Sequence, residues 1–320
     1  MDKYVTFEEY RDMWRITNQA ISHVPKDEQY SEYEGIRLPL HTAKVVEDLK
    51  TWEVRHDDVW IITYPKSGTI WTQEITSAVM HDGNLDAIRA RHVLFRVVYI
   101  DKTLPAEIRR LKNVPDSHRL AEEISSPRVL RSHLPGPLLP LQLWEKKPRI
   151  IYVMRNFKDV AVSYFYFMKM AINDRATLNQ SFGEFLDEMM SGKVPYGTWW
   201  EHVLFFWKRR HEKNILFLRY EDLKADLRGN VEKICNFLGK DLSAASLDAI
   251  TQHCSFTAMK SNPMAHIDLI FDRQGLPEDV TFMRKGEVGD WKLHFTVAQN
   301  EVVENHIEEK IRGSGLTIKS

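Results

Sequence analysis

The sequence predicts an α/β fold, with a central, mostly parallel sheet flanked by helices. Short runs rich in Val, Ile, Leu and aromatic residues alternate with stretches whose apolar residues recur at helical spacing. No linker long enough to separate two domains interrupts the 320 residues, and 43% of them are hydrophobic, which is enough for one continuous core. We therefore expect a single domain over residues 1–320.

Four runs predict buried strands, and a helical pattern follows three of them. The strands are expected at 58–64, 128–132, 149–155 and 215–220, and the helices at 69–80, 159–171 and 230–238. Each strand ends in polar or charged residues, and ligands of open α/β sheets bind outside the carboxyl ends of strands. We expect three of these ends to meet over one anionic ligand, and we expect the proline-rich segment 134–141 to form a surface loop.

The composition of the chain argues against several classes of partner. The chain has 44 Lys and Arg against 45 Asp and Glu, so no global field draws it to nucleic acid or to a membrane surface. The N-terminal segment lacks the apolar core of a signal peptide, and no run approaches the roughly 20 apolar residues of a membrane span. Cys235 and Cys254 have no metal-site or disulfide spacing. We expect a cytoplasmic protein without a metal, a nucleic-acid partner or a membrane partner.

The segment "YPKSGTIW" (64–71) predicts an anion site between the first strand and its helix. Pro65 stiffens the exit from the strand, Gly68 permits a close approach of the backbone, and Thr69 begins a helix whose free N–H groups favour an anion. Lys66 adds a positive charge and Ser67 a hydroxyl donor. The spacing is not that of nucleotide triphosphatases, where glycine precedes the lysine. A simple turn with an exposed lysine explains this segment equally well when it is taken alone.

Two further segments carry cations at strand or loop ends. In "RNFKDVAVSYF", Arg155 ends a strand and Ser163 lies about two helical turns beyond it. In "FMRKGEVGDWKLHFT", Arg284 and Lys285 precede Gly286 in a flexible loop that could close over a phosphate. Each segment by itself is better explained by a salt bridge or by a solvated loop.

His133 stands at the end of the strand in "RVLRSHLPGP". An imidazole at such a place can act as a base near neutral pH. A lone histidine there is more often structural.

Taken together and in order, several segments resemble the cytosolic sulfotransferase family, whose donor is 3'-phosphoadenosine 5'-phosphosulfate (PAPS). The resemblance runs from about Gly35 to Glu304 and includes the motifs "YPKSGTIWTQEI", "SPRVLRSHLP", "RNFKDVAVSYF", "VPYGTWWEHV", "LFLRYEDL", "HCSFTAM" and "RKGEVGDWKLHFTVAQNE". It implies a P-loop-like strand–loop–helix that binds the phosphosulfate. It also implies in-line transfer of a sulfuryl group to the hydroxyl or amine of a small apolar acceptor such as a phenol, steroid or alcohol. The other product would be adenosine 3',5'-bisphosphate, and no metal is implied.

The resemblance implies a role for each matching residue. The 5'-phosphosulfate loop would be formed by Lys66, Ser67, Gly68, Thr69, Ile70 and Trp71. The 3'-phosphate would be held by Arg155, Ser163, Arg284, Lys285 and Gly286. The nucleoside would be surrounded by Tyr196, Cys254, Ser255, Phe256 and Met259. Catalysis would rest on His133 as general base and on Lys66, Arg131 and Ser163.

Three positions depart from the usual pattern of the family. Arg131 stands where many members have lysine, and Ile70 and Cys254 stand where threonine is common. A guanidinium keeps the charge of lysine but not its geometry, so the transfer rate could fall, and the loss of hydroxyls could weaken PAPS binding. These departures keep open a catalytically silent member of the same fold that only binds nucleotide or lipid. A specialised branch that releases an alkene is a further alternative.

The resemblance also implies a homodimer, through Lys292, Thr296, Val297 and Glu301. The acceptor pocket is expected to be aromatic, because apolar contacts bind phenols and sterols. Candidate lining residues are Phe165, Phe167, Met168, Phe256 and Trp199. Segments 84–120 and 261–281 have the irregular composition of acceptor-gating loops.

Overall fold

A computed structural model gives the architecture, and it describes residues 3–22, 24, 26–172, 175–271, 276–278 and 280–319. A five-stranded sheet with the order β4–β5–β3–β6–β7 lies at the centre, and all of its neighbouring strands are parallel. Its strands are β3 (Val59–Thr63), β4 (Val98–Tyr99), β5 (Val129–Ser132), β6 (Arg149–Met154) and β7 (Ile215–Arg219). The α/β prediction is confirmed, and the four predicted strands agree with the structure to within one residue at each end.

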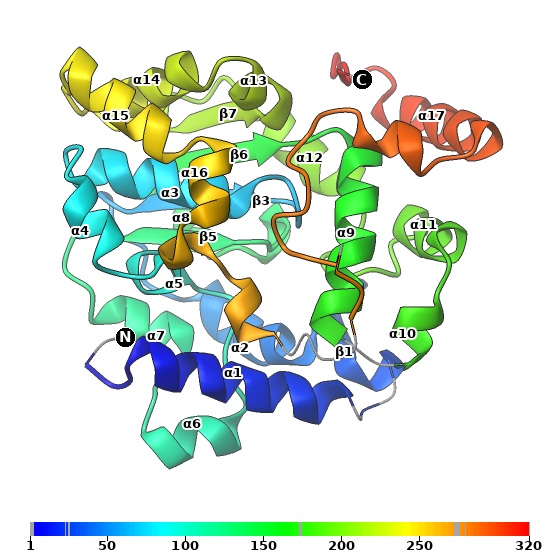
Figure 1. Cartoon of the computed structure of the whole chain (residues 1–320), viewed down its shortest axis with the longest axis horizontal. Coiled ribbons are helices and arrows are strands. Elements are labelled where there is room, and N and C mark those ends of the chain that lie inside the picture. The colour runs from blue at the N-terminus through cyan, green and yellow to red at the C-terminus, as the bar shows by residue number, and fades with distance from the viewer. Residues whose placement is uncertain are drawn as a thin grey trace.

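Helices cover both faces of this sheet (Figure 1). The helices are α1 (Phe7–Ser22), α2 (Leu40–Lys50), α3 (Thr69–Met80), α4 (Leu85–Arg89), α5 (Val93–Arg96), α6 (Ala106–Lys112), α7 (Ser117–Glu122), α8 (Leu141–Lys146), α9 (Phe157–Ile172), α10 (Arg175–Asn179), α11 (Phe182–Met190), α12 (Trp199–Trp207), α13 (Tyr220–Ala225), α14 (Leu227–Phe237), α15 (Ala244–His253), α16 (Phe256–Ser261) and α17 (Val297–Ile311). Along β6, Ile150 and Tyr152 pack with α2, α8, α9 and α12, whereas Ile151 and Val153 pack with α3, α14 and α15. Successive side chains of a strand point to opposite faces of its sheet, so this alternation shows that β6 is buried on both sides.

The helix boundaries follow local capping. The predicted helix 69–80 has the bounds of α3, and the predicted helix 159–171 is α9, which begins just after Asn156 because its Oδ1 accepts from the Lys158 N–H at 2.8 Å. The predicted helix 230–238 begins earlier, as α14 at Leu227. The reason is that Asp226 caps it by accepting from the Gly229 N–H at 2.8 Å.

Some elements escaped prediction. The edge strand β4 has two residues, too few for a hydrophobic pattern, and it pairs Val98 with Leu130 and Tyr99 with Arg131. The hairpin of β1 (Tyr30–Tyr33) and β2 (Ile36–Pro39) also went unpredicted. Segment 134–141 is not a surface loop, since most of it is buried and leucines of the segment belong to the core.

The gating segments have defined structure where they are described. Segment 84–120 folds into α4, α5, β4, α6 and α7. Segment 261–281 includes the turns η3 (Pro263–Ala265) and η4 (Asp268–Ile270), and its residues 272–275 and 279 lie outside the described residues. Helix α1 packs beside η4 and α9, and Asn18 on α1 donates to the Ile270 carbonyl at 2.9 Å. Across the described residues, no helix is both long and apolar enough to cross a membrane.

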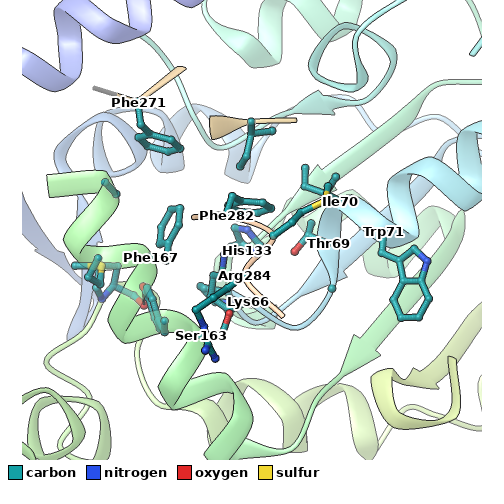
Figure 2. Close-up of a pocket in the computed structure, with 18 of the residues that line it drawn as sticks. Lys66, Thr69, Ile70, Trp71, His133, Ser163, Phe167, Phe271, Phe282 and Arg284 are labelled. Atoms are coloured by element: carbon teal, nitrogen blue, oxygen red, sulfur yellow. Dashed lines mark hydrogen bonds between the residues drawn. The ribbon is translucent and has the colours of Figure 1, made fainter. Parts of the chain in front are cut away.

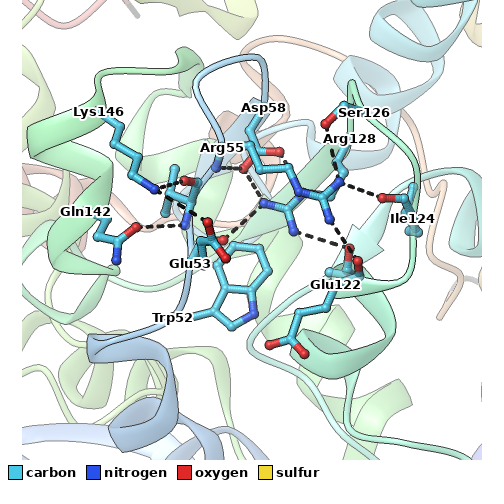
Figure 3. Close-up of polar contacts among 12 residues, drawn as sticks. Trp52, Glu53, Arg55, Asp58, Glu122, Ile124, Ser126, Arg128, Gln142 and Lys146 are labelled. Carbon is cyan, nitrogen blue, oxygen red and sulfur yellow. Dashed lines mark hydrogen bonds and ion pairs between the residues drawn. The ribbon is translucent and has the colours of Figure 1, made fainter.

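A buried ion pair joins the beginnings of β3 and β5 (Figure 3). Arg128 donates to the two carboxylate oxygens of Asp58 from Nε at 2.7 Å and from a terminal nitrogen at 2.6 Å, and both side chains are almost fully buried. The guanidinium also donates to the Glu53 carbonyl at 3.2 Å and lies 4.4 Å from the Trp52 ring centre. Asp58 also accepts from the Arg55 N–H at 2.8 Å. This cluster fixes the two strands whose opposite ends carry Lys66 and His133.

Candidate active site

The carboxyl ends of β3, β5, β6 and β7 open into one pocket. Lys66, His133, Arg155 and Tyr220, each of which follows one of these strands, line it together. Figure 2 shows Lys66, His133 and Arg284 around this pocket, with the rings of Phe167, Phe271 and Phe282 beside them. The expected meeting of strand ends is confirmed.

The loop between β3 and α3 has the backbone of an anion cradle. Lys66 and Gly68 both adopt positive φ, 68° and 100°, so the loop turns tightly before the free N–H groups at the start of α3. A Cβ on Gly68 would lie 2.9 Å from a carbon of the Tyr220 ring, so this position requires glycine. The buried hydroxyl of Ser67 has no hydrogen-bond partner among the described residues. Ser67 itself does not line the pocket, so the donors that this loop presents to a ligand are the N–H groups at the start of α3.

Arg155 joins this loop to segment 282–290. Its guanidinium donates to the Lys66 carbonyl at 3.3 Å and to the Glu287 carbonyl at 3.1 Å, and it lies 4.2 Å from the Tyr220 ring centre. Its Nε is buried and has no partner within the described chain. Arg155 thus links the two loops, and its Nε–H remains available to donate to a ligand.

Asp290 holds the second cationic loop, which contains Arg284 and Lys285. Asp290 pairs with Arg284 and accepts from the Lys285 ammonium at 2.7 Å. Gly286 has φ of 66°, and a Cβ there would lie 2.2 Å from a carbon of the Phe256 ring. Its carbonyl accepts from the Tyr220 hydroxyl at 3.2 Å. The two cations therefore line the same pocket as Phe256 and Tyr220.

Lys66 lies in an apolar setting. Its Nζ is 3.6 Å from the Phe282 ring centre and 4.5 Å from that of Phe167. Burial, reinforced by the charge of Arg155, lowers the pKa of Lys66 from 10.5 to about 7, whereas Asp268 acts in the opposite direction. An anion bound beside Lys66 would restore its full charge.

We expect the return of Lys66 to its charged form on anion binding to be measurable as proton uptake. Around pH 8, above the lowered pKa of about 7, much of Lys66 is neutral in the free protein, and a bound anion raises that pKa. Binding of adenosine 3',5'-bisphosphate should then take up a proton, up to about one per site. Calorimetric titration in buffers of different ionisation enthalpy measures this number. Lys66→Arg should abolish the uptake because a guanidinium stays charged, and equal uptake by this variant would contradict the assignment.

His133 is held in one tautomer. Its Nδ1 lies 2.8 Å from the Thr63 carbonyl oxygen and 3.2 Å from the Thr63 hydroxyl. A carbonyl can only accept, so Nδ1 carries the proton and Nε2 keeps its lone pair. Burial lowers the pKa of His133 to about 3, which keeps the ring neutral. The Thr63 hydroxyl also contacts that of Thr69 at 2.8 Å, so the same strand end supports the histidine and the start of α3.

Two tyrosines enclose His133. The ring centres of Tyr99 and Tyr196 lie 5.3 and 5.5 Å from that of His133, and their hydroxyls are 2.9 Å apart. Arg131 lies 4.2 Å from the Tyr99 ring centre. Tyr196, expected beside a nucleoside, is thus placed beside the histidine. Tyr99 was not predicted at all, because β4 is so short.

Tyr220 lines the pocket but was not among the predicted site residues. It lies 5.3 Å from the Trp71 ring centre, and it also contacts Gly68 and Arg155. Trp71 is anchored by donating its indole N–H to the Cys254 carbonyl at 2.7 Å. Tyr220 ends the predicted strand 215–220, so the rule on strand ends was the signal that could have identified it.

The remaining predicted residues divide into two groups. Those that line the pocket are Ile70, Ser163, Phe167, Met168, Phe256 and Met259. Cys254 is instead fully buried behind Trp71, and Ser255 caps α16 by accepting from the Ala258 N–H at 3.3 Å. Trp199 belongs to the core and donates to the Arg155 carbonyl at 3.1 Å, and Phe165 packs on Phe182. The expectation that Trp199 and Phe165 line the acceptor pocket is therefore wrong.

Comparisons with known proteins agree with this geometry. Residues 56–315 match the family model described as the sulfotransferase domain. The chain is 38% identical over 299 residues to Sulfotransferase 1E1 of Cavia porcellus, a match covering 92% of this chain and 96% of that protein. It is 38% identical over 288 residues to Sulfotransferase 1A1 of Bos taurus, covering 89% and 94%.

Solved structures resemble it as well. Mouse sulfotransferase SULT7A1 complexed with PAP aligns with a TM-score of 0.70 and 29% identity, covering 89% of this chain and 95% of that one. Retinol dehydratase in complex with androsterone and PAP aligns with a TM-score of 0.80 over 98% and 96%; at 23% identity this shows a shared fold.

The chain therefore belongs to the sulfotransferase family. It is an enzyme that transfers sulfuryl groups with PAPS as co-substrate, which confirms the expectation drawn from its motifs.

Proposed function

We propose that the enzyme sulfates a hydroxyl or amine of a small, mainly apolar acceptor, with His133 as general base. The observation that carries the proposal is the fixed tautomer of His133, whose Nδ1–H donates to the Thr63 carbonyl. Its Nε2 is therefore free to accept the proton of an acceptor hydroxyl. The lowered pKa, about 3, keeps this nitrogen unprotonated throughout the physiological range.

We assign the donor site to the carboxyl ends of β3, β6 and β7, on the side of His133 away from the acceptor. Lys66, Thr69 and the N–H groups of α3 would hold the 5' end of PAPS, whereas Arg155, Ser163 and Arg284 would hold its 3'-phosphate. PAPS supplies the sulfuryl group that is transferred. The unpartnered Arg155 Nε and the glycine-only position 68 support this fit. Tyr220 and Trp71 offer flat faces for the base.

Lys66 and Arg131 would act electrostatically. Lys66 lies in the loop just before α3, where its charge and the helix N–H groups can stabilise negative charge that builds on the departing phosphate. Arg131 lines the same pocket two residues before His133 and stacks on Tyr99. The charge of Arg131 also helps to keep His133 neutral.

The acceptor side is mainly apolar. Tyr99, Tyr196 and Phe167 line the pocket together with Met168 and Phe271. Such a wall suits a ring or a hydrocarbon chain, with one polar end directed at His133. A cytoplasmic location is part of the same proposal, and the two free, buried cysteines support it.

Titration of the purified protein with adenosine 3',5'-bisphosphate beside adenosine 5'-monophosphate tests the donor site. We expect the bisphosphate to bind at least about tenfold more tightly, because it adds charge-assisted contacts with Arg155 and Arg284. Arg284→Ala should remove most of this preference and leave monophosphate affinity within about threefold.

Arg228→Ala is the matched control, since Arg228 of α14 pairs with Glu232 on the same helix and with Asp248 on α15, and it does not line the pocket. It should leave both affinities unchanged. Equal binding of the two nucleotides by the wild-type protein would refute the two-phosphate site.

We also propose a homodimer through the segment that contains Lys292, Thr296, Val297 and Glu301. Thr296 caps α17 in a capping box with Gln299, and Val297 and the nearby Leu293 are 76% and 77% exposed. Val297→Glu should shift the sedimentation coefficient from dimer to monomer at micromolar concentration, because a carboxylate would enter an apolar contact. A wild-type protein that sediments as a monomer would contradict the proposal.

A further inference from the structure

Lys102, like Lys66, is a lysine of the pocket whose ammonium has no hydrogen-bond or ion-pair partner among the described residues. Lys102 follows the edge strand β4, lines the pocket and is half-buried. Its Nζ lies 4.1 Å from the centre of the Trp14 ring of α1, and no hydrogen bond or ion pair joins that ammonium to any residue in the described part of the chain. The Trp14 ring attracts this ammonium through a cation–π contact, but it carries no negative charge that could neutralise it.

The order of the strands separates Lys102 from the donor site. The sheet runs β4–β5–β3–β6–β7, so Lys102 after β4 and Lys66 after β3 lie on opposite sides of His133, which follows β5. Arg155 and Tyr220 lie further away still, after β6 and β7. The charge of Lys102 therefore faces the acceptor half of the pocket.

Among the described residues, no carboxylate lines the acceptor half of the pocket to balance this charge. Among the described residues, the acids that line the pocket are Glu287 and Asp290, both in the loop of the donor half. Burial and the charge of Arg131 lower the pKa of Lys102 from 10.5 to about 8, so the ammonium stays largely charged at neutral pH, and the charge of Asp101 opposes this shift. Asp101 is itself fully buried, does not line the pocket and forms no ion pair with Lys102 in the described structure. Arg131 contributes a second cation on this side.

The polar groups around Lys102 also suit an anion. Asn18, His41 and Thr42 line the same pocket as Lys102, and His41 is close enough for the charge of Lys102 to act on it. Burial lowers the pKa of His41 to about 4, helped by the charges of Lys102 and Lys44, while the charge of Glu107 opposes the shift. The His41 ring is therefore neutral, and its Nδ1 is buried without a partner in the described structure. The acceptor half of the pocket therefore combines the cation Lys102 with uncharged polar groups, on the side of His133 away from the donor site.

We propose that the preferred acceptor is an apolar hydroxy acid, whose carboxylate pairs with Lys102 while its hydroxyl faces His133. This inference rests on the proposed function and specifies the acceptor class of the same site. The carboxylate neutralises the charge of Lys102, and the apolar body of the acceptor lies against the aromatic wall. A neutral alcohol of the same shape leaves Lys102 unpaired.

Binding of matched acids and esters tests the proposal in the full-length protein saturated with adenosine 3',5'-bisphosphate. The probes are lithocholate and ω-hydroxydodecanoate, each beside its methyl ester. We expect at least one acid to bind about tenfold or more tightly than its ester. Lys102→Met should reduce this ratio to below about twofold, and Lys102→Arg should keep it.

Lys44→Met is the matched control, because Lys44 is an exposed lysine near His41 that does not line the pocket. It should retain the wild-type ratio. Acids that bind no more tightly than their esters in the wild-type protein, or a preference that survives Lys102→Met, would overturn the proposal. Transfer from PAPS to the esters and bisphosphate binding are measured on the same samples. If both persist without a preference for the acids, this inference fails and the proposed function stands, whereas loss of both removes the proposed function.

Discussion

His133→Gln should lower kcat for sulfuryl transfer by about 10²–10⁴, the range typical of a lost general base. Glutamine keeps a polar side chain at the end of β5 but cannot take up the acceptor's proton. The wild-type rate should show no acidic limb near pH 6.5, because burial lowers the pKa of His133 to about 3 and the base stays unprotonated above that value. Initial rates between pH 5 and pH 8 measure both effects.

Two controls separate a catalytic effect from a structural one. Affinity for adenosine 3',5'-bisphosphate should stay within about threefold in His133→Gln, since the donor site lies on the other side of the ring. The loss of rate should also be smaller for a phenol that is already ionised at the assay pH, because such an acceptor has no proton to give. An equal loss for ionised and un-ionised phenols would show that His133 is not the base.

Asp58→Ala should lower the free energy of unfolding by about 3–5 kcal/mol, since it leaves the Arg128 guanidinium buried without its counter-charge. Arg128 is 1% exposed and donates to both oxygens of Asp58. Urea unfolding followed by fluorescence measures the change from the midpoint and slope.

A surface pair gives the comparison for this second prediction. Asp248→Ala breaks the exposed contact with Arg228 and should cost no more than about 1 kcal/mol. The double variant Asp58→Ala, Arg128→Met should be more stable than Asp58→Ala alone, because the unpaired charge is gone. If Asp58→Ala and Asp248→Ala had similar costs, the buried pair would not be what fastens β3 to β5.

The sequence predicted those parts of the fold whose signal is local. The strands β3, β5, β6 and β7 are short runs rich in apolar residues, and their polar ends identified Lys66, His133 and Arg155 as groups that meet. Helix α3 was predicted with its observed bounds because the glycine before it and its apolar spacing both mark it.

What escaped prediction depends on tertiary contacts. Tyr196 and Tyr220 are both aromatic residues next to polar segments, and only the packing shows that the first contacts His133 and the second Trp71. Trp199 was expected in the pocket because it is aromatic, but aromatic residues also fill cores, as its burial and its hydrogen bond to the Arg155 carbonyl show. The unpaired state of Lys102 depends on every neighbouring element, so no local pattern could reveal it.

The parallel pairing of β3 with β5 bears on how new acceptors arise in this enzyme. Ile62 pairs with Ser132, so Thr63 and His133 come next on adjacent strands, and the separation between Lys66 and His133 is set by the sheet. The acceptor wall, in contrast, is built from α1, α2 and the residues that follow β4. Evolution or a designer can therefore exchange the wall to admit a different molecule, while the distance over which the sulfuryl group travels is inherited unchanged.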